Sequence, residues 1–270
     1  MRRGRRETDV IADLHVHTTA SDGQLTIPEI PARAREAGVD VVAVTDHDRV
    51  HPALDAPVAT RDGVTVVRGL ELRVDAGEHR LDLRGYCADP TPDLPAELDR
   101  IQRDRVQRAR QMVDLIEAET GVSLDLPVGP GIGRPHIARA VAESSAPYDY
   151  AGAFGRLIGG EGPCYVPREI TDAETGIALL RESCGLVSLA HPFRYRDPEA
   201  ALKICAELDA VERYYAYDQP MDPAPVEHAI ERYDLLPTGG SDAHDQRLGV
   251  AGLDSADWER VASRLPGAER

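Results

Sequence analysis

The most informative stretch of this chain is Asp13-Leu14-His15-Val16-His17-Thr18-Thr19-Ala20-Ser21-Asp22-Gly23. It follows the apolar residues Val10-Ile11-Ala12, which predict a short strand. Side chains two apart on a strand share one face, so His15 and His17 project from the same face. Two imidazoles in this arrangement can bind one divalent ion. The turn at the end of the stretch can direct the carboxylate of Asp22 to the same point. The stretch by itself leaves two interpretations open, a metal site and a histidine pair on a solvated strand face.

Apolar runs of strand length alternate with segments of helical spacing through most of the chain. The runs comprise residues 39–44, 64–67, 81–86, 186–190, 210–212 and 235–238. This alternation is typical of a parallel βα sheet or barrel. Between residues 94 and 120 the apolar spacing becomes helical, and the other positions are densely charged. We therefore expect an α/β barrel that is discontinuous in sequence (residues 8–93 and 173–253), a helical insertion (residues 94–172) and a C-terminal tail (residues 254–270).

The composition narrows the class of protein. With 270 residues, of which 42% are hydrophobic, the chain can bury a substantial core. No apolar run approaches the roughly 20 residues needed to span a bilayer, and no secretory leader is visible, so we expect a cytoplasmic protein with no membrane contact. The four cysteines have no Cys-x-x-Cys spacing, which argues against a zinc knuckle and a disulfide framework. A net charge of −16 repels polyanions unless metal ions or local arginines reverse it.

Residues that can bind metals follow the apolar runs closely. They are His15, His17, Asp46, His47, Glu71, His191, Glu212, Asp242 and His244. In βα architectures this edge collects ligands and catalytic groups, because the strands supply a rigid base and the following loops vary freely. One such residue means little, but their repetition on successive strands predicts a site.

The number of these ligands exceeds the four that a tetrahedral zinc takes. Two or three divalent ions that share a carboxylate fit better, with Glu71 as the bridging residue. Such clusters suit phosphate-ester hydrolysis by a metal-bridged hydroxide, because they lower the pKa of a bound water toward about 7 and neutralise phosphoryl charge. Arg134 and His136, beside Pro135 at a predicted helix start, offer a guanidinium for phosphate contact and a proton donor.

Several of these residues also have ordinary structural interpretations. His191, which precedes Pro192, could be a core histidine at a strand end, and Asp242 could simply form a turn. Glu212 could pair with Arg213. The arginine-rich helix around residues 100–110 is interleaved with Asp and Gln and reads as a solvated face, with an RNA-contacting face as the alternative.

Taken in order, the motifs resemble those of the polymerase-and-histidinol-phosphatase (PHP) family. They are Asp-Leu-His-Val-His-Thr from Asp13, Thr-Asp-His-Asp from Thr45, Gly-Leu-Glu ending at Glu71, Ala-His-Pro around His191 and Gly-Ser-Asp-Ala-His ending at His244. Arg-Pro-His-Ile-Ala from Arg134 resembles the branch of nucleoside 3′,5′-bisphosphate phosphatases, 5′-to-3′ exoribonucleases and cyclic phosphodiesterases. The resemblance implies a distorted seven-stranded (β/α) barrel of PHP type with a helical insertion and a trinuclear metal centre.

The resemblance also implies a role for each matching position. His15, His17, Glu71 and Asp242 would hold one ion, Glu71 and His191 a second, and Asp22, His47 and His244 a third. Arg134 and His136 match positions that contact the substrate phosphate.

One position departs from the branch, in which a histidine follows the glutamate by eleven residues. Here that position is Asp82, a harder ligand that would favour Mn²⁺ or Mg²⁺ over Zn²⁺.

The sequence therefore predicts a metal-dependent phosphoesterase that acts on a nucleotide or a similar small phosphorylated molecule, with two to three divalent ions (Mn²⁺, Zn²⁺, Fe²⁺ or Mg²⁺). Glu71, Arg134 and His136 are the expected catalytic residues. An exoribonuclease or cyclic phosphodiesterase acting on short substrates such as short RNA is the alternative within this class. A module that binds metal and nucleotide without cleavage is the alternative outside it. No obligate protein partner is expected.

Overall fold

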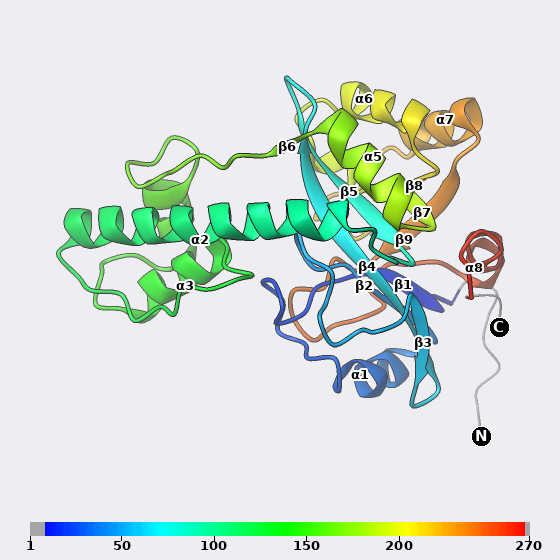
Figure 1. The fold of residues 1–270 in the computed structure, drawn as a ribbon, viewed down its shortest axis with the longest axis horizontal. Helices are drawn as coiled ribbons and strands as arrows, with labels where there is room; N and C mark the ends of the chain where they lie inside the picture. The colour runs from blue at the N-terminus through cyan, green and yellow to red at the C-terminus, as the bar shows by residue number, and fades with distance from the viewer. Residues whose placement is uncertain (1–8, 268–270) are drawn as a thin grey trace. The chain divides into compact units, whose positions relative to one another are not determined.

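A sheet of nine strands forms the framework of the computed structural model, which describes residues 9–267 (Figure 1). The strands are β1 (Ala12–Val16), β2 (Val41–Val44), β3 (Val58–Arg61), β4 (Val64–Asp75), β5 (Arg80–Tyr86), β6 (Thr171–Asp172), β7 (Leu186–Leu189), β8 (Ala210–Tyr215) and β9 (Leu236–Gly240). Seven of them follow one path in the order β1-β2-β4-β5-β7-β8-β9, while β3 and β6 pair with β4.

The two ends of this path approach each other and nearly close a barrel. Val16 in β1 forms a parallel bridge with Ala243, just beyond β9. The backbone N–H of His17 donates to the Ala243 carbonyl at 3.0 Å. Strand β5 runs antiparallel to both β4 and β7, whereas the other neighbours on the path are parallel. The predicted distorted seven-stranded barrel is confirmed, with β5 as its reversed strand.

A tight hairpin explains the reversal of β5. Only residues 76–79 separate β4 from β5, and the backbone N–H of Ala76 donates to the His79 carbonyl at 2.8 Å. Gly77 has a φ of 82°, in the left-handed region that glycine adopts without strain. A connection this short permits only antiparallel pairing, because a parallel crossover needs a dozen or more residues.

The helices begin and end where local capping allows. They are α1 (Ile30–Ala37), α2 (Asp93–Thr120), α3 (Arg134–Glu143), α4 (Tyr150–Gly152), α5 (Ala173–Ser183), α6 (Pro198–Ala201), α7 (Ala224–Tyr233) and α8 (Ser255–Ala262), with short π or 3₁₀ segments at Ala153–Ile158, Pro192–Arg194 and Leu202–Glu207. Helix α5 was not predicted from the sequence; it packs beside β4 and β5 (Figure 1). Its start carries an N-cap, since the Asp172 carboxylate accepts from the Thr175 N–H at 2.9 Å.

The described chain divides into two compact units. One contains the barrel strands and comprises the residues up to Pro95 and from Thr171 onward; the other is Ala96–Ile170. Within this helical unit, α2 and α3 pack around a core that includes Met112, Ile116 and Val141. No helix within residues 9–267 combines the length and the apolarity needed to cross a bilayer.

The core of the barrel unit lies on both faces of the sheet. All four residues of β2 are buried, and alternate ones join different clusters: Val41 and Ala43 contribute to one, Val42 and Val44 to the other. This two-sided burial is typical of parallel strands covered on both faces. Helix α8 packs Trp258 into the first of these clusters, a long-range contact that its sequence did not signal.

Candidate metal centre

The ends of six barrel strands bring nine potential metal ligands together. They form three groups, within each of which one donor atom per residue lies within 4.8 Å of the others: His15, His17 and Asp242; Glu71, Asp82 and His191; and His17, Asp22, His47 and His244. All nine metal-ligand positions predicted from the sequence are therefore brought together. The grouping differs from the expectation in two respects, because His17 belongs to two groups and Glu71 belongs only to the group with Asp82 and His191.

Glu71, on β4, touches all three groups. Its Oε1 atom lies 3.3 Å from His15 Nε2 and 3.2 Å from His191 Nε2. Its Oε2 atom lies 2.9 Å from His47 Nδ1 and 3.5 Å from His17 Nε2. The side chain is only 1% exposed. A buried carboxylate whose two oxygens face different donor sets has the geometry of a bridging ligand.

Several buried donor atoms in these groups make no hydrogen bond within residues 9–267. They are His15 Nε2, both ring nitrogens of His17, Asp22 Oδ1, both carboxylate oxygens of Glu71 and His191 Nδ1. Buried polar atoms normally find partners, because leaving one unpaired costs about 1–3 kcal/mol. Nitrogen and oxygen donors that converge without hydrogen bonds fit divalent cations, which would satisfy them together.

The backbone at two of the ligand positions is strained. His191 has a φ of 29° and Asp242 a φ of 51°, although neither is glycine. Such conformations cost about 1–3 kcal/mol each and persist where the surrounding structure imposes them, which is common at functional sites.

A buried ion pair behind the centre orients His15. Its Nδ1 lies 3.2 Å from Glu212 Oε1, and the fully buried Arg84 donates to the same oxygen at 2.7 Å. A carboxylate accepts only, so Nδ1 carries a proton that it donates to Glu212, and Nε2 is the ring atom that would bind a metal once its own proton is displaced. Glu212 also accepts the His191 backbone N–H at 2.6 Å. This pair was missed: the sequence suggested Arg213 as the partner of Glu212, but Arg213 pairs with Glu227.

Two further aspartates anchor the loops that carry ligands. The Asp46 carboxylate accepts from the hydroxyls of Thr18 and Ser21 at 2.7 and 2.6 Å, which fixes the loop before Asp22. Asp13 accepts from the Ser241 hydroxyl at 2.6 Å and from the Gly249 N–H at 2.8 Å, which fixes the loop around Asp242. These carboxylates position ligands and are not members of the three groups.

Mutual contacts set the charge states of the cluster. Burial favours the neutral carboxyl of Glu71, but His15 and His47 hold its pKa well below the usual range. Burial would likewise lower the pKa of His15, yet Asp242, Glu212 and Glu71 raise it to about 10. The pKa of His17 is lowered by burial and by the neighbouring His47 and His244. In the metal-free chain, protons thus supply positive charge that bound cations would replace.

Asp82 is shared between the cluster and an arginine. Its Oδ2 atom lies 3.7 Å from His191 Nε2. The Arg73 guanidinium spans both oxygens, with Nε 2.7 Å from Oδ1 and Nη2 2.5 Å from Oδ2. Each carboxylate oxygen has a second lone pair, so the ion pair leaves Asp82 able to ligate. The sequence pattern gave no sign of this bidentate partner.

Comparison with known proteins assigns the family. The model of the PHP domain matches residues 13–215, a span that includes the strands that carry most of the ligand groups. The chain belongs to the PHP family.

Relatives in this family share much of the chain's length. A 3′,5′-nucleoside bisphosphate phosphatase of Chromobacterium violaceum is 33% identical over 194 residues, which cover 68% of this chain and 67% of the relative. The 5′-3′ exoribonuclease Rnm of Escherichia coli is 30% identical over 250 residues, covering 87% and 85%. A solved structure of an amidohydrolase from Chromobacterium violaceum with bound sulfate and no metal superposes with a TM-score of 0.76 at 26% identity, covering 94% of this chain and 96% of that one.

Arg134 and His136 lie together in the first turn of α3, in the helical unit of this PHP chain. His136 Nδ1 accepts the Gly133 N–H at 3.1 Å. The Arg134 guanidinium lies 5.7 Å from the centre of the Phe154 ring and 6.0 Å from that of Tyr165. A guanidinium beside aromatic rings keeps its planar donor fork, which suits phosphate contact.

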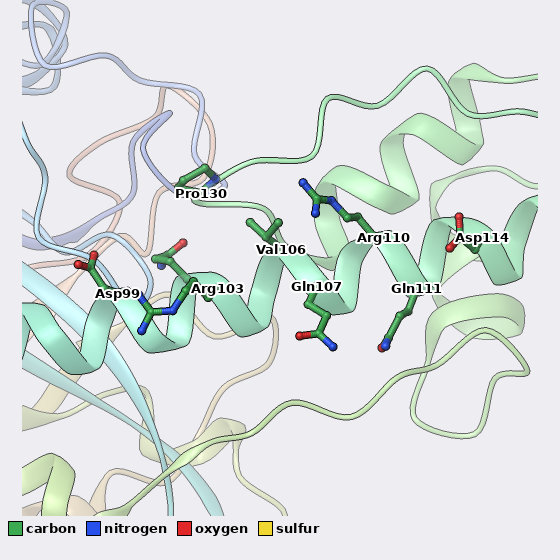
Figure 2. A pocket seen from close by; sticks show the side chains of 9 residues that line it. Asp99, Arg103, Val106, Gln107, Arg110, Gln111, Asp114 and Pro130 are labelled. Carbon is green, nitrogen blue, oxygen red and sulfur yellow. The ribbon is translucent and has the colours of Figure 1, made fainter.

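A hollow of about 630 Å³ lies along α2 in the same unit (Figure 2). Its lining includes Arg103 and Arg110 but also Asp99 and Asp114. The two positive and two negative charges cancel, so the hollow has no net attraction for a phosphate backbone. A second hollow along the same helix is lined by Arg100, Arg103, Arg108 and Arg168 against only Asp104 and Glu169, so the solvated face and the RNA-contacting face both stand as interpretations of this helix.

Proposed function

We propose that this protein hydrolyses phosphate esters with two to three divalent metal ions held by the nine residues of the three ligand groups. The observation that carries the proposal is the contact of Glu71 with all three groups, because a shared carboxylate holds ions close enough to act on one phosphoryl group. Bound ions would lower the pKa of a water to about 7 and neutralise charge on the phosphoryl oxygens.

The protein side chains supply orientation and proton transfer. Glu212 accepts the proton of His15 Nδ1 and so orients Nε2 of that ring toward Glu71. We assign Arg134 to bidentate contact with the substrate phosphate. We assign His136 to protonation of the leaving oxygen: its Nδ1 accepts the Gly133 N–H, so a neutral ring carries its proton on Nε2, where it can be donated. On this proposal the helical insertion, residues 94–172, contributes two substrate-contacting residues, Arg134 and His136.

The preferred metal follows from Asp82. An aspartate in the Glu71–Asp82–His191 group makes that group richer in oxygen than a site with a second histidine. We therefore propose Mn²⁺ or Mg²⁺ at this position, since hard oxygen ligands suit these ions better than Zn²⁺.

A nucleotide phosphatase is the first candidate activity, supported by the similarity to the nucleoside bisphosphate phosphatase. A 5′-to-3′ exoribonuclease is the second, because the similarity to the exoribonuclease Rnm extends over 87% of this chain. A cytoplasmic location remains a prediction.

A substrate panel decides between these activities. The protein is incubated with Mn²⁺ and mononucleotides, 3′,5′-bisphosphates, cyclic phosphodiesters or short RNA, and released phosphate and product lengths are recorded. Phosphate released from bisphosphates alone supports the phosphatase, and stepwise shortening of RNA supports the exoribonuclease. Turnover of cyclic esters alone indicates a cyclic phosphodiesterase. No turnover with bound Mn²⁺ would reject the proposal in favour of a binding module.

A further inference from the structure

Three aromatic residues gather at the edge of the metal centre in the barrel unit. Phe193 lies in the short turn after β7, and Tyr215 and Tyr217 lie at and just after the end of β8. The ring centroids of Tyr215 and Tyr217 are 4.6 Å apart, and those of Phe193 and Tyr217 are 5.5 Å apart. The Tyr215 ring also lies 5.7 Å from the ring of His191. All three side chains are partly exposed. The whole chain has only two phenylalanines and nine tyrosines, three of which form this cluster.

Arg194 joins this aromatic cluster to the metal centre. It lies three residues after His191 in a 3₁₀ turn, closed by the Arg194 N–H donating to the His191 carbonyl at 2.9 Å. Its Nη1 donates to Asp242 Oδ2 at 3.0 Å and to the Tyr215 hydroxyl at 3.1 Å. The Tyr215 hydroxyl donates to the same Asp242 oxygen at 2.8 Å.

The two oxygens of Asp242 therefore serve different partners. Oδ1 faces His15 Nε2 and His17 Nε2 at 3.2 and 3.1 Å, whereas Oδ2 is occupied by Tyr215 and Arg194. The two hydrogen bonds of Nη1, to Asp242 and Tyr215, hold one edge of the Arg194 guanidinium in place.

The remaining N–H donors of that guanidinium are available to a ligand. The Arg194 side chain is 54% exposed, and its Nε and Nη2 donors have no partner within residues 9–267. A guanidinium held by one nitrogen, with its other donors exposed, presents a ready contact for a phosphate oxygen. Arg194 also places positive charge where the carboxylates and the net charge of −16 would repel an anionic substrate.

We propose that Arg194 and the aromatic cluster form the substrate subsite of the barrel unit, in which Arg194 contacts a phosphate group and the rings of Phe193 and Tyr217 contact a nucleobase. This inference rests on the proposed function and narrows it to esters that carry a planar aromatic base. Nucleobases stack on aromatic side chains with little dependence on base identity, so the subsite accepts purines and pyrimidines.

The test compares one substrate that has a base with one that lacks it. Adenosine 3′,5′-bisphosphate and ribose 5-phosphate are turned over with Mn²⁺ by the wild type and by Tyr217→Leu and Arg194→Gln. We expect Tyr217→Leu to raise KM about 10-fold or more for the bisphosphate and to leave KM for ribose 5-phosphate unchanged. Arg194→Gln should raise KM for both substrates by about 10- to 100-fold with bound Mn²⁺ unchanged.

Matched variants control for structural damage. Tyr217→Phe keeps the ring and removes only the hydroxyl that accepts the Phe193 N–H, so it should restore most of the affinity for the bisphosphate that Tyr217→Leu loses. Arg196→Gln removes an exposed arginine two residues away, and Tyr233→Leu removes a tyrosine on α7; neither should change KM.

Two results would overturn the inference. If Tyr217→Leu changes KM equally for both substrates or for neither, the cluster does not recognise a base. If Arg194→Gln loses Mn²⁺ by mass spectrometry in proportion to activity, Arg194 only positions Asp242. Calorimetric binding of adenosine 5′-monophosphate to the Mn²⁺-loaded wild type and variants decides the matter even without turnover, which separates this failure from that of the proposed function.

Discussion

The deep side and the outer side of the metal centre are built differently. On the deep side, His15 and Glu71 are at most 1% exposed, and the Arg84–Glu212 pair supports His15 from behind. On the outer side, His47 and His244 are 23% and 38% exposed. The deep ligands are thus fixed by the fold itself, whereas the outer ligands depend on loops. We expect the two sides to respond differently to mutation, to chelators and to pH.

The largest effect should come from Glu71→Gln, which removes the carboxylate shared by the two sides. The amide is nearly isosteric but uncharged, so it cannot bridge cations. We expect kcat on a generic phosphate ester to fall by about 1000-fold or more, since metal activation of water is lost. Far-ultraviolet circular dichroism should stay as in the wild type. Retained hydrolysis would refute the bridging role.

Arg84→Met should lower the free energy of unfolding by removing the support on the deep side of the metal centre. It leaves the Glu212 carboxylate buried without its cationic partner, and losing one member of a buried ion pair costs about 3–5 kcal/mol. Urea unfolding measures this loss. Arg213→Met is the matched control: its partner Glu227 is 38% exposed, so we expect a loss of at most about 1 kcal/mol. Equal losses in both variants would contradict the claim that the buried Arg84–Glu212 pair contributes more to stability than the partly exposed Arg213–Glu227 pair.

His244→Ala tests whether the outer side of the metal centre can lose its ion independently of the deep side. Its ring stacks on that of His17, with centroids 4.2 Å apart, but it is 38% exposed, so the melting temperature of the metal-free protein should fall only modestly. The ion held with Asp22 and His47 should bind about 10- to 100-fold more weakly. Mass spectrometry after graded chelation should show one ion lost early, while the remaining ions stay bound. Simultaneous loss of all ions would mean that the two sides are not independent.

The smallest expected effect is a shift in the pH at which the protein is most stable to heat. In the chelated protein the pKa of His15 is raised from 6.5 to about 10, so its contribution to stability is full below about pH 6.5 and is lost as pH rises toward 10. Glu71 and Asp242 have lowered pKa values, so their contribution is present above about pH 4.5 and is lost in acid. We expect the chelated protein to melt highest between about pH 5 and 6.5. The metal-loaded protein should peak at higher pH, because ligand imidazoles must be neutral. Thermal melts of both forms across this range measure the difference.

The positions of the predicted ligands were readable because strand periodicity is local. His15 and His17 share a face for that reason, and Glu71, His191 and Asp242 each lie at or just after a buried apolar run. The carboxyl ends of parallel strands meet at one end of a barrel, so this convergence could be predicted without knowing the register. Asp82 reaches the same end from near the amino end of the reversed strand β5. The fold class was predicted correctly on the same grounds. Their role as metal ligands stays a prediction until metal binding is measured.

Other features depended on pairings that local patterns do not encode. The sequence alone predicted the strands of the barrel path and the ligands they carry, because periodicity, caps and turns act over a few residues, but it gave no sign of α5 or of the short strands β3 and β6. Only the tertiary structure decided that Arg84 meets Glu212 across 128 residues and that Arg194 meets Asp242 across 48. A charged side chain has many candidate partners of opposite sign, and packing of the surrounding strands selects one of them.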